Sequence, residues 1–240
     1  MNEVIALEIT FNFGDGINSI YPVILKDEKE MILIDCGYKH FLSLIKKAVE
    51  AKGINLNELT KIIITHHDFD HMGSLAEFKR EYPNIEIISS YDDEKYISGK
   101  EKSLRLQQAE LLHDSLPQDQ KKDAENFQKL LKSVECVKVD MMVKDKDILP
   151  WCGGVEVIAT PGHMPGHISL YLKEFKTLIS GDALVVENGE LVIANPNYTL
   201  DMGEAKKSIE KLLNYDIEKI ICYHGGIYTE NIKDSLEKIL

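Results

Sequence analysis

The chain has 240 residues, of which 44% are hydrophobic and 28% are charged, a composition ordinary for a folded globular protein. Its formal net charge is −12 and only two residues are arginines, Arg80 and Arg105, so it lacks the basic footprint of a nucleic-acid-binding protein. No apolar run approaches the ~20 residues of a membrane-spanning helix, and we therefore expect neither nucleic acid nor membrane among its partners.

The beginning of the chain is rich in β-branched and aromatic residues. We predict strands over residues 4–11, 18–25 and 31–34 on this ground. Residues 39–51 carry apolar side chains at helical spacing, and Gly53 is well placed to end that helix.

The next segment repeats the order of strand and helix. Residues 61–65 form a nearly continuous apolar run, which is typical of a strand buried on both faces. A helix is predicted over residues 74–82, because Pro83 and Asn84 follow it as stop signals. Residues 85–89 are predicted to form another short strand.

Residues 92–133 differ in composition from the rest of the chain. They are rich in Lys, Glu, Gln and Asp, and their leucines fall at helical spacing. We interpret this segment as a helical insertion on the main scaffold. Charge-laced helices usually just face water, so a solvated outer helix pair is the simpler interpretation. A lid over an active site is the alternative.

From residue 134 the strand pattern returns. No repeat, low-complexity segment or linker divides the chain, so we expect a single domain over residues 1–240. The predicted strands cover residues 137–141, 155–159, 168–172, 177–180, 191–193 and 217–222, and the predicted helices cover residues 204–213 and 230–240.

The four cysteines are widely spaced, and no pair of them forms a C-x-x-C motif. In a chain of this length such cysteines predict reduced and mostly buried thiols. The N-terminus also lacks a basic stretch followed by an apolar one, the pattern of a secretory signal. We therefore expect a cytoplasmic location.

Side chains that bind metals gather directly after the predicted strand 61–65, in the segment Thr65-His66-His67-Asp68-Phe69-Asp70-His71. Imidazole and carboxylate groups both ligate zinc, iron and manganese. Alternate residues of an extended chain point to the same side, so His66, Asp68 and Asp70 are predicted to face one cavity, with His71 where the chain turns. A helix cap needs one such residue rather than four, which favours a metal site.

Three later segments carry further candidate ligands. In the loop Thr160-Pro161-Gly162-His163-Met164-Pro165-Gly166-His167, the glycines permit the ring of His163 to reach inward. Two apolar strands end in Gly181-Asp182 and in Tyr223-His224. Each segment alone is a weak signal, but together and at these strand ends they predict a metal centre.

With these motifs the sequence resembles the metallo-β-lactamase-fold hydrolases. That family carries T-H-x-H-x-D-H after a buried strand, then a G-H-x-x-G-H loop, a G-D and a late histidine. The likeness runs from the Asp35-Cys36-Gly37 turn to His224. The resemblance implies an α/β fold of the α+β kind, a four-layer αββα sandwich in which residues 92–133 form the helical insertion.

The resemblance also implies a binuclear centre with two divalent metal ions. Zinc is the first expectation, and iron and manganese are the alternatives. Asp35 is similar to the family's structural aspartate near the site, and His167 to its loop-bracing histidine. By position, one ion is held by His66, Asp68 and His163, the other by Asp70, His71 and His224, and Asp182 bridges them.

The sequence departs from the family motif at Asp68, which stands where the family has its second histidine. His67 is one residue off, and the alternation points it away from the site. The added oxygen donor makes the site harder, which somewhat favours iron or manganese. Three carboxylates offset three of the four charges of two divalent ions, so a bridging hydroxide leaves the cluster near neutral.

The chemistry that the resemblance implies is hydrolysis. Two metal ions share a water and lower its pKa toward ~7, and the resulting hydroxide attacks a polarised carbonyl. Asp70 is expected to orient the nucleophile or to pass a proton to the leaving group. The expected partner is a small-molecule substrate, namely an ester, lactone, thioester or amide, and a homodimer is compatible with the sequence.

Two other interpretations stay open. A non-haem iron redox enzyme on the same fold, similar to the persulfide dioxygenases, is mildly favoured by Asp68. A metal-free binding protein with vestigial ligands is disfavoured by the completeness of the ligand set. Lactone-cleaving relatives often have a tyrosine three residues after the bridging aspartate, where this chain has Val185, and Tyr198 or Tyr228 could take its place.

Overall fold

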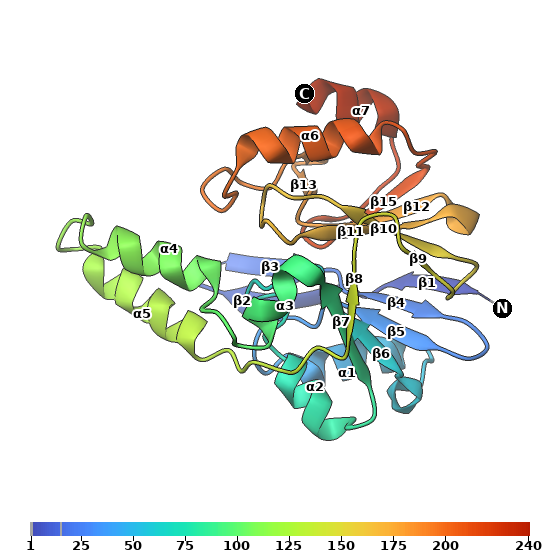
Figure 1. Cartoon of the computed structure of the whole chain (residues 1–240), viewed down its shortest axis with the longest axis horizontal. Coiled ribbons are helices and arrows are strands. Elements are labelled where there is room, and N and C mark those ends of the chain that lie inside the picture. The colour runs from blue at the N-terminus through green and yellow to red at the C-terminus, as the bar shows by residue number, and fades with distance from the viewer. Residues whose placement is uncertain (1, 15) are drawn as a thin grey trace.

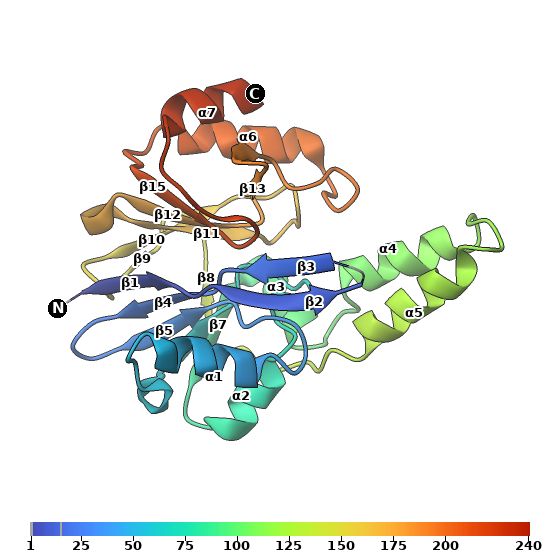
Figure 2. The ribbon, with the colours of Figure 1, turned by 180° about the vertical axis from the view of Figure 1, so that it is seen from behind.

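A computed structural model describes residues 2–14 and 16–240 of the chain. Two sheets lie face to face in the middle of the molecule (Figure 1). Helices α1 (Leu42–Ala51) and α2 (Leu75–Glu81) cover one outer face. Helices α6 (Met202–Leu212) and α7 (Ile232–Ile239) cover the other, as the reverse view in Figure 2 also shows. The predicted αββα sandwich is confirmed.

The first sheet has six strands in the order β1-β4-β5-β6-β7-β8, and its last four strands are parallel. Strands β1 and β4 join it in antiparallel pairings. The bounds are β1 (Glu3–Ala6), β4 (Val23–Lys26), β5 (Met31–Ile34), β6 (Lys61–Ile63), β7 (Glu86–Ser90) and β8 (Met141–Val143), and a separate hairpin is formed by β2 (Ile9–Phe13) and β3 (Gly16–Ile20).

The second sheet also has six strands, in the order β16-β15-β12-β11-β10-β9. Only the pair of β12 and β15 is parallel. The bounds are β9 (Ile148–Leu149), β10 (Val155–Ala159), β11 (Ile168–Leu172), β12 (Thr177–Gly181), β15 (Lys219–Cys222) and β16 (Gly226–Tyr228), and a small hairpin is formed by β13 (Val185–Glu187) and β14 (Glu190–Val192).

Alternating side chains divide the interior into three apolar layers. In β5, Met31 and Leu33 pack against the α1 and α2 side, whereas Ile32 and Ile34 pack between the two sheets. In β12, Leu178 packs toward α6 and α7, and Ile179 between the sheets. Because successive strand residues point to opposite faces, a strand covered on both sides must be apolar throughout.

The segment between β7 and β8 is helical, as predicted. It contains α3 (Tyr91–Ile97), α4 (Leu104–His113) and α5 (Lys121–Lys132). Helices α4 and α5 lie side by side and project from the body of the sandwich (Figures 1 and 2). Single turns of 3₁₀ helix occur at Leu56–Glu58 and Lys173–Phe175. Within the part of the chain that the structure describes, no helix has the length and apolar character needed to cross a bilayer.

Three strand predictions need correction. The runs 4–11 and 18–25 each break into two strands, because β1 pairs with β4 whereas β2 pairs with β3. Residues 137–140 form no strand. Val137 and Val139 are buried against the helical layer, so their alternation comes from packing rather than from a ladder of backbone hydrogen bonds.

Candidate metal centre

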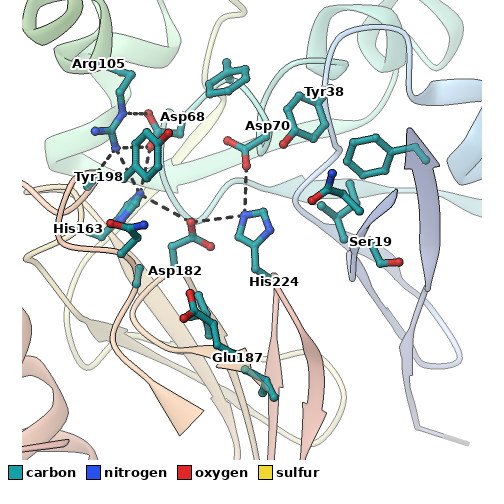
Figure 3. Close-up of a pocket in the computed structure, with 18 of the residues that line it drawn as sticks. Ser19, Tyr38, Asp68, Asp70, Arg105, His163, Asp182, Glu187, Tyr198 and His224 are labelled. Carbon is teal, nitrogen blue, oxygen red and sulfur yellow. Dashed lines mark hydrogen bonds and ion pairs between the residues drawn. The ribbon is translucent and has the colours of Figure 1, made fainter. Parts of the chain in front are cut away.

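The predicted metal-binding segments meet at one edge of the sandwich. Residues 66–71 follow β6, and His163 lies in the loop between β10 and β11. Asp182 follows β12 directly, and His224 lies between β15 and β16. Figure 3 shows Asp68, Asp70, His163, Asp182 and His224 converging from these different strands. Loops at strand ends on a rigid scaffold are where functional side chains are usually held.

The structure brings together all seven residues that the sequence singles out. Their nitrogen and oxygen atoms form three groups, and within each group the ligand atoms lie within 4.8 Å of one another. We call the first group the Asp68 subsite and the second the Asp70 subsite. The Asp68 subsite consists of His66, Asp68 and His163, the Asp70 subsite of Asp70, His71 and His224, and the third group of His66, His71 and Asp182.

Asp182 lies between the two subsites. Its Oδ2 is 3.7 Å from Nε2 of His163 and 3.6 Å from Nε2 of His224. Its Oδ1 is 3.4 Å from Nε2 of His71. One carboxylate therefore faces histidines of both subsites.

The segment after β6 is not extended, although the predicted alternation of His66, Asp68 and Asp70 assumed an extended backbone. The chain bends at Thr65 and His66 and turns at residues 69–71, where the backbone N–H groups of His71 and Met72 donate to the carbonyl oxygen of Asp68. The three side chains of the prediction still face one cavity. A tight turn, rather than strand alternation, is what gathers them.

Hydrogen bonds fix the imidazole rings of His66 and His71. Thr65 Oγ1 donates its proton to Asp35 Oδ2 at 2.8 Å, so His66 Nδ1 must donate to Thr65 Oγ1 at 3.0 Å. His71 Nδ1 donates to Asp35 Oδ2 at 2.9 Å. Both rings therefore direct Nε2 into the site, which is the orientation a metal-binding histidine needs.

The loop of His167 is held by a continuous hydrogen-bond chain. The backbone N–H of Asp182 donates to His167 Nε2 at 2.9 Å, so His167 Nδ1 carries the proton and donates to Thr160 Oγ1 at 2.8 Å. Thr160 then donates to Ser169, and Ser169 to the carbonyl oxygen of Ser180. Burial lowers the pKa of His167 to about 3, so the ring stays neutral. His167 braces the loop without contributing to any of the three groups of ligand atoms.

The donor set fits a divalent cation. Three buried atoms that face the site have no hydrogen-bond partner among the described residues, namely His66 Nε2, His71 Nε2 and Asp182 Oδ1. Buried polar atoms are nearly always paired, so orphans of this kind need an explanation, and a bound cation satisfies all three. Imidazole nitrogen with carboxylate oxygen suits zinc, iron or manganese.

Charge interactions keep the carboxylates ionised. Burial raises the pKa of Asp68, but the neighbouring His163 and His66 and the charge of Arg105 outweigh this effect and hold the pKa well below its usual range. The pKa of Asp182 is likewise held well below its usual range. Burial raises this pKa, but the neighbouring His224 and His71 outweigh the effect of burial. Ionised carboxylates are the form that binds metal ions.

His67 lies outside this centre. Its Nδ1 is 3.0 Å from Asp93 Oδ1, its Nε2 accepts from the backbone N–H of Leu104, and its ring stacks on Tyr96. The register inferred from the sequence, which points His67 away from the other ligands, agrees with this position. Its role is to hold the first residues of α4 against the metal-binding segment.

Arg105 is a site residue that the sequence reasoning missed. It comes from α4, is 3% exposed, and grips Asp68 with two nitrogens, Nε to Oδ1 at 3.2 Å and Nη2 to Oδ2 at 2.7 Å. As one of only two arginines, set between Leu104 and Leu106 in a polar segment, it carried a signal of burial. The charge balance predicted from the sequence for the metal cluster counted only the three carboxylates and left out the positive charge of Arg105.

A cavity of about 420 Å³ opens over the centre. Its wall includes Tyr38 and Tyr198, both visible in Figure 3, and Val185 also lines it. Tyr228 is excluded as a cavity residue, because its hydroxyl pairs with Ser235 beneath α7. Tyr38, which the sequence reasoning overlooked, lines the cavity on the side of the β2–β3 hairpin.

Comparisons with known proteins agree with this geometry. The family model described as the metallo-beta-lactamase superfamily matches residues 15–224. The probable metallo-hydrolase YflN of Bacillus subtilis is 26% identical over 239 residues, which cover 93% of this chain and 86% of that protein. A hydroxyacylglutathione hydrolase of Buchnera aphidicola is 26% identical over 162 residues, 68% of this chain and 46% of that protein.

A solved structure shows the same fold. The metallo-beta-lactamase family protein TTHA1429 from Thermus thermophilus superposes with a TM-score of 0.77 at 20% identity, over 98% of this chain and 77% of that one. The match to the family model spans most of the chain and includes every residue of both subsites. The chain therefore belongs to the metallo-β-lactamase superfamily, and within it is a metal-dependent hydrolase.

Proposed function

We propose that this hydrolase cleaves a small ester, lactone, thioester or amide with two divalent metal ions, zinc first among them. The observation that carries the proposal is the position of Asp182, whose two oxygens face histidines of both subsites. Residues of the Asp68 subsite would hold one ion and those of the Asp70 subsite the other. Ions in such a centre supply hydroxide at neutral pH and polarise the carbonyl under attack.

Asp70 is the proposed catalytic residue. Its Oδ2 accepts a hydrogen bond from His224 Nε2 at 3.1 Å, and its backbone carbonyl is held by the Tyr223 hydroxyl at 2.6 Å. Asp70 also lines the cavity, so its carboxylate can take a proton from the nucleophile and pass it to the leaving group.

Tyr38 is the proposed hydrogen-bond donor to the substrate. Burial, followed by the charges of Asp70 and Asp182, raises the pKa of Tyr38 far above its usual range, so the hydroxyl keeps its proton. A neutral phenol beside the reacting carbonyl can donate to the negative oxygen that develops during attack. Tyr38 would then take the place of the tyrosine that lactone-cleaving relatives often carry three residues after the bridging aspartate.

The walls of the cavity favour a neutral acyl substrate. Apart from the candidate ligands, they combine aromatic rings with neutral polar side chains such as Asn18 and Ser19 and one carboxylate, Glu187. The cation Arg105 is already paired with Asp68, and this arrangement disfavours an anionic substrate. The volume of about 420 Å³ suits a small molecule. The name of one relative, hydroxyacylglutathione hydrolase, supports hydrolysis of an acyl group. We propose that this activity takes place in the cytoplasm, where widely spaced cysteines of this kind stay reduced.

The test begins with metal analysis by elemental mass spectrometry on protein purified without added metal. We expect about two zinc ions per chain. The same preparation is then assayed on a panel of lactones, esters, thioesters and amides, with an otherwise identical Asp182→Asn preparation as the inactive control. Predominant iron, together with oxygen consumption on thiol or persulfide substrates, would overturn the hydrolase in favour of a redox enzyme.

A further inference from the structure

Arg105 is the residue of α4 that enters the metal centre. Each of its three guanidinium nitrogen groups has a partner. Nε and Nη2 bind Asp68, Nη2 also donates to the carbonyl oxygen of Tyr198 at 2.8 Å, and Nη1 donates to Gln108 at 2.9 Å. The guanidinium also lies 5.6 Å from the centre of the Tyr198 ring. Such a side chain is fixed in one position and has little freedom to turn toward a substrate.

The atom that Arg105 contacts most closely is the Asp68 oxygen that also faces both histidines of the Asp68 subsite. Asp68 Oδ2 is 2.7 Å from Arg105 Nη2 and 3.0 Å from His163 Nε2. Arg105 Nη2 is itself 3.5 Å from His163 Nε2 (Figure 3). A fixed cation therefore stands directly beside the place where this subsite gathers its donors.

The Asp70 subsite has no comparable neighbour. Among residues 2–14 and 16–240, the ion pairs of Asp70 are with His71 and His224 alone. Those of Asp182 are with histidines too. The two subsites therefore differ in charge, although each offers two histidines and one carboxylate.

The formal charges of the centre determine how strongly it attracts a second metal ion. Asp68, Asp70 and Asp182 bring three negative charges, and Arg105 offsets one of them. One divalent ion balances the two that remain, so the second ion enters a centre that is already neutral. A guanidinium also draws electron density from the carboxylate that it grips, which makes Asp68 a weaker donor and repels a cation at the same oxygen.

We propose that Arg105 makes the two subsites unequal, so that the Asp70 subsite binds its ion tightly and the Asp68 subsite binds its ion at least about tenfold more weakly. The inference rests on the proposed two-ion function. It assigns Arg105 as a positioning residue through which the helical insertion sets the occupancy of the Asp68 subsite. The size of the effect corresponds to the change that a neighbour of a metal ligand typically produces.

The test is a titration of metal-free protein with Zn²⁺ in competition with a chromogenic chelator, which counts the ions and measures each affinity. For the wild type we expect two steps separated by about tenfold or more. Arg105→Gln removes the charge and should tighten the weaker step at least about tenfold while leaving the tight step unchanged. Arg105→Lys keeps the charge and should keep the steps apart.

The tight step serves as an internal control for folding, because it needs Asp70, His71 and His224 in place. Arg80→Gln is the matched control, since Arg80 is exposed and pairs only with Glu135 among the described residues. Equal Zn²⁺ affinities of the two subsites in the wild type, or weaker binding of the second Zn²⁺ in Arg105→Gln, would overturn the inference. Arg105 would then only hold the Asp68 side chain in position. Failure of the wild type to bind any Zn²⁺ would instead overturn the proposed function.

Discussion

At the scale of single residues, the centre is organised by groups that touch a ligand rather than by the ligands alone. Asp35 accepts from the backbone N–H of Thr65, from the Thr65 hydroxyl and from His71 Nδ1. One buried carboxylate thus fixes the rings of two histidines, one from each subsite. Partners of this kind commonly change metal affinity by about 10- to 100-fold when they are removed.

Asp35→Asn is the residue-scale prediction for this arrangement. Asp35 has φ of 59°, and asparagine tolerates that conformation, so the backbone should be preserved. The carboxylate of Asp35 accepts hydrogen bonds from Thr65 and His71 through both of its oxygens. The amide of asparagine has only one oxygen that can accept, so some of these bonds are lost. We expect Zn²⁺ affinity to fall about 10- to 100-fold, measured by chelator competition. Unchanged affinity would mean that the His71 ring is held by other contacts.

Asp182→Asn addresses the carboxylate between the subsites. Because its oxygens face both subsites, we expect the variant to retain at most about one ion and to lose about 100-fold or more in hydrolysis. Elemental mass spectrometry and the ester assay measure the two effects. The matched control is Glu187→Gln, a carboxylate that lines the same cavity but belongs to none of the three ligand groups. A control that also lost metal would point to general electrostatics instead.

At the scale of secondary structure, the helical insertion is tied to the metal-binding segment by two successive residues. His67 accepts from the backbone N–H of Leu104, and Asp68 accepts from the side chain of Arg105. The next turns of α4 lie farther from the body, and Leu111 is 82% exposed. The start of α4 is therefore anchored, whereas its far end faces solvent.

His67→Ala tests this anchor. The side chain is buried and bonded at both nitrogens, so we expect the free energy of unfolding to fall by about 2 kcal/mol. Amide hydrogen exchange should speed up in α4 before it does in β6 or β7. His40→Asn is the comparison variant, because the His40 side chain is 79% exposed and its φ of 71° suits asparagine. Equal effects in both variants would refute an anchoring role.

The candidate ligand segments could be predicted from the sequence because each follows a buried apolar strand, and two of the histidines lie next to a glycine. Those signals are local: Gly162 with φ of 138° and Gly225 with φ of 87° sit beside His163 and His224. The contact of Arg105 with Asp68 spans 37 residues and depends on how α4 docks. No local pattern encodes such a docking, and a lone arginine between two leucines was the one local hint of it.

At the scale of the whole molecule, the centre joins the two halves of the sandwich. His66, Asp68, Asp70 and His71 follow a strand of the first sheet, and His163, Asp182 and His224 follow strands of the second. Metal binding should therefore stabilise the complete fold rather than one part of it. At about 100 times the dissociation constant, a ligand of the native state adds about 2.7 kcal/mol.

Removal of the metal with a chelator should accordingly lower the melting temperature by about 5–10 °C for a chain of this size. The expected transition stays single, because both sheets depend on the same centre. Differential scanning calorimetry with and without chelator measures the shift. Two separate transitions, one of them insensitive to the chelator, would show that the halves unfold independently.

The number of cysteines that a thiol reagent can reach is a second measure of the whole fold. Cys36, Cys152 and Cys222 are buried, whereas Cys136 is exposed. Iodoacetamide should therefore modify one thiol in the native protein and four after unfolding, as counted by intact mass. Partial burial raises the pKa of Cys136 above its usual 9.0, so the thiolate fraction is lower at neutral pH and the labelling rate should keep rising past pH 9.

The division of the ligands between the sheets has one more consequence. The two six-stranded sheets come from two consecutive stretches of chain. The first sheet ends with β8 at residue 143, and the second begins with β9 at residue 148. Each stretch carries only part of the candidate ligand set. If the polypeptide were cut there and the two pieces produced as separate molecules, metal would act as the ligand that two complementing fragments share, and their reassociation would be switched on and off by its supply.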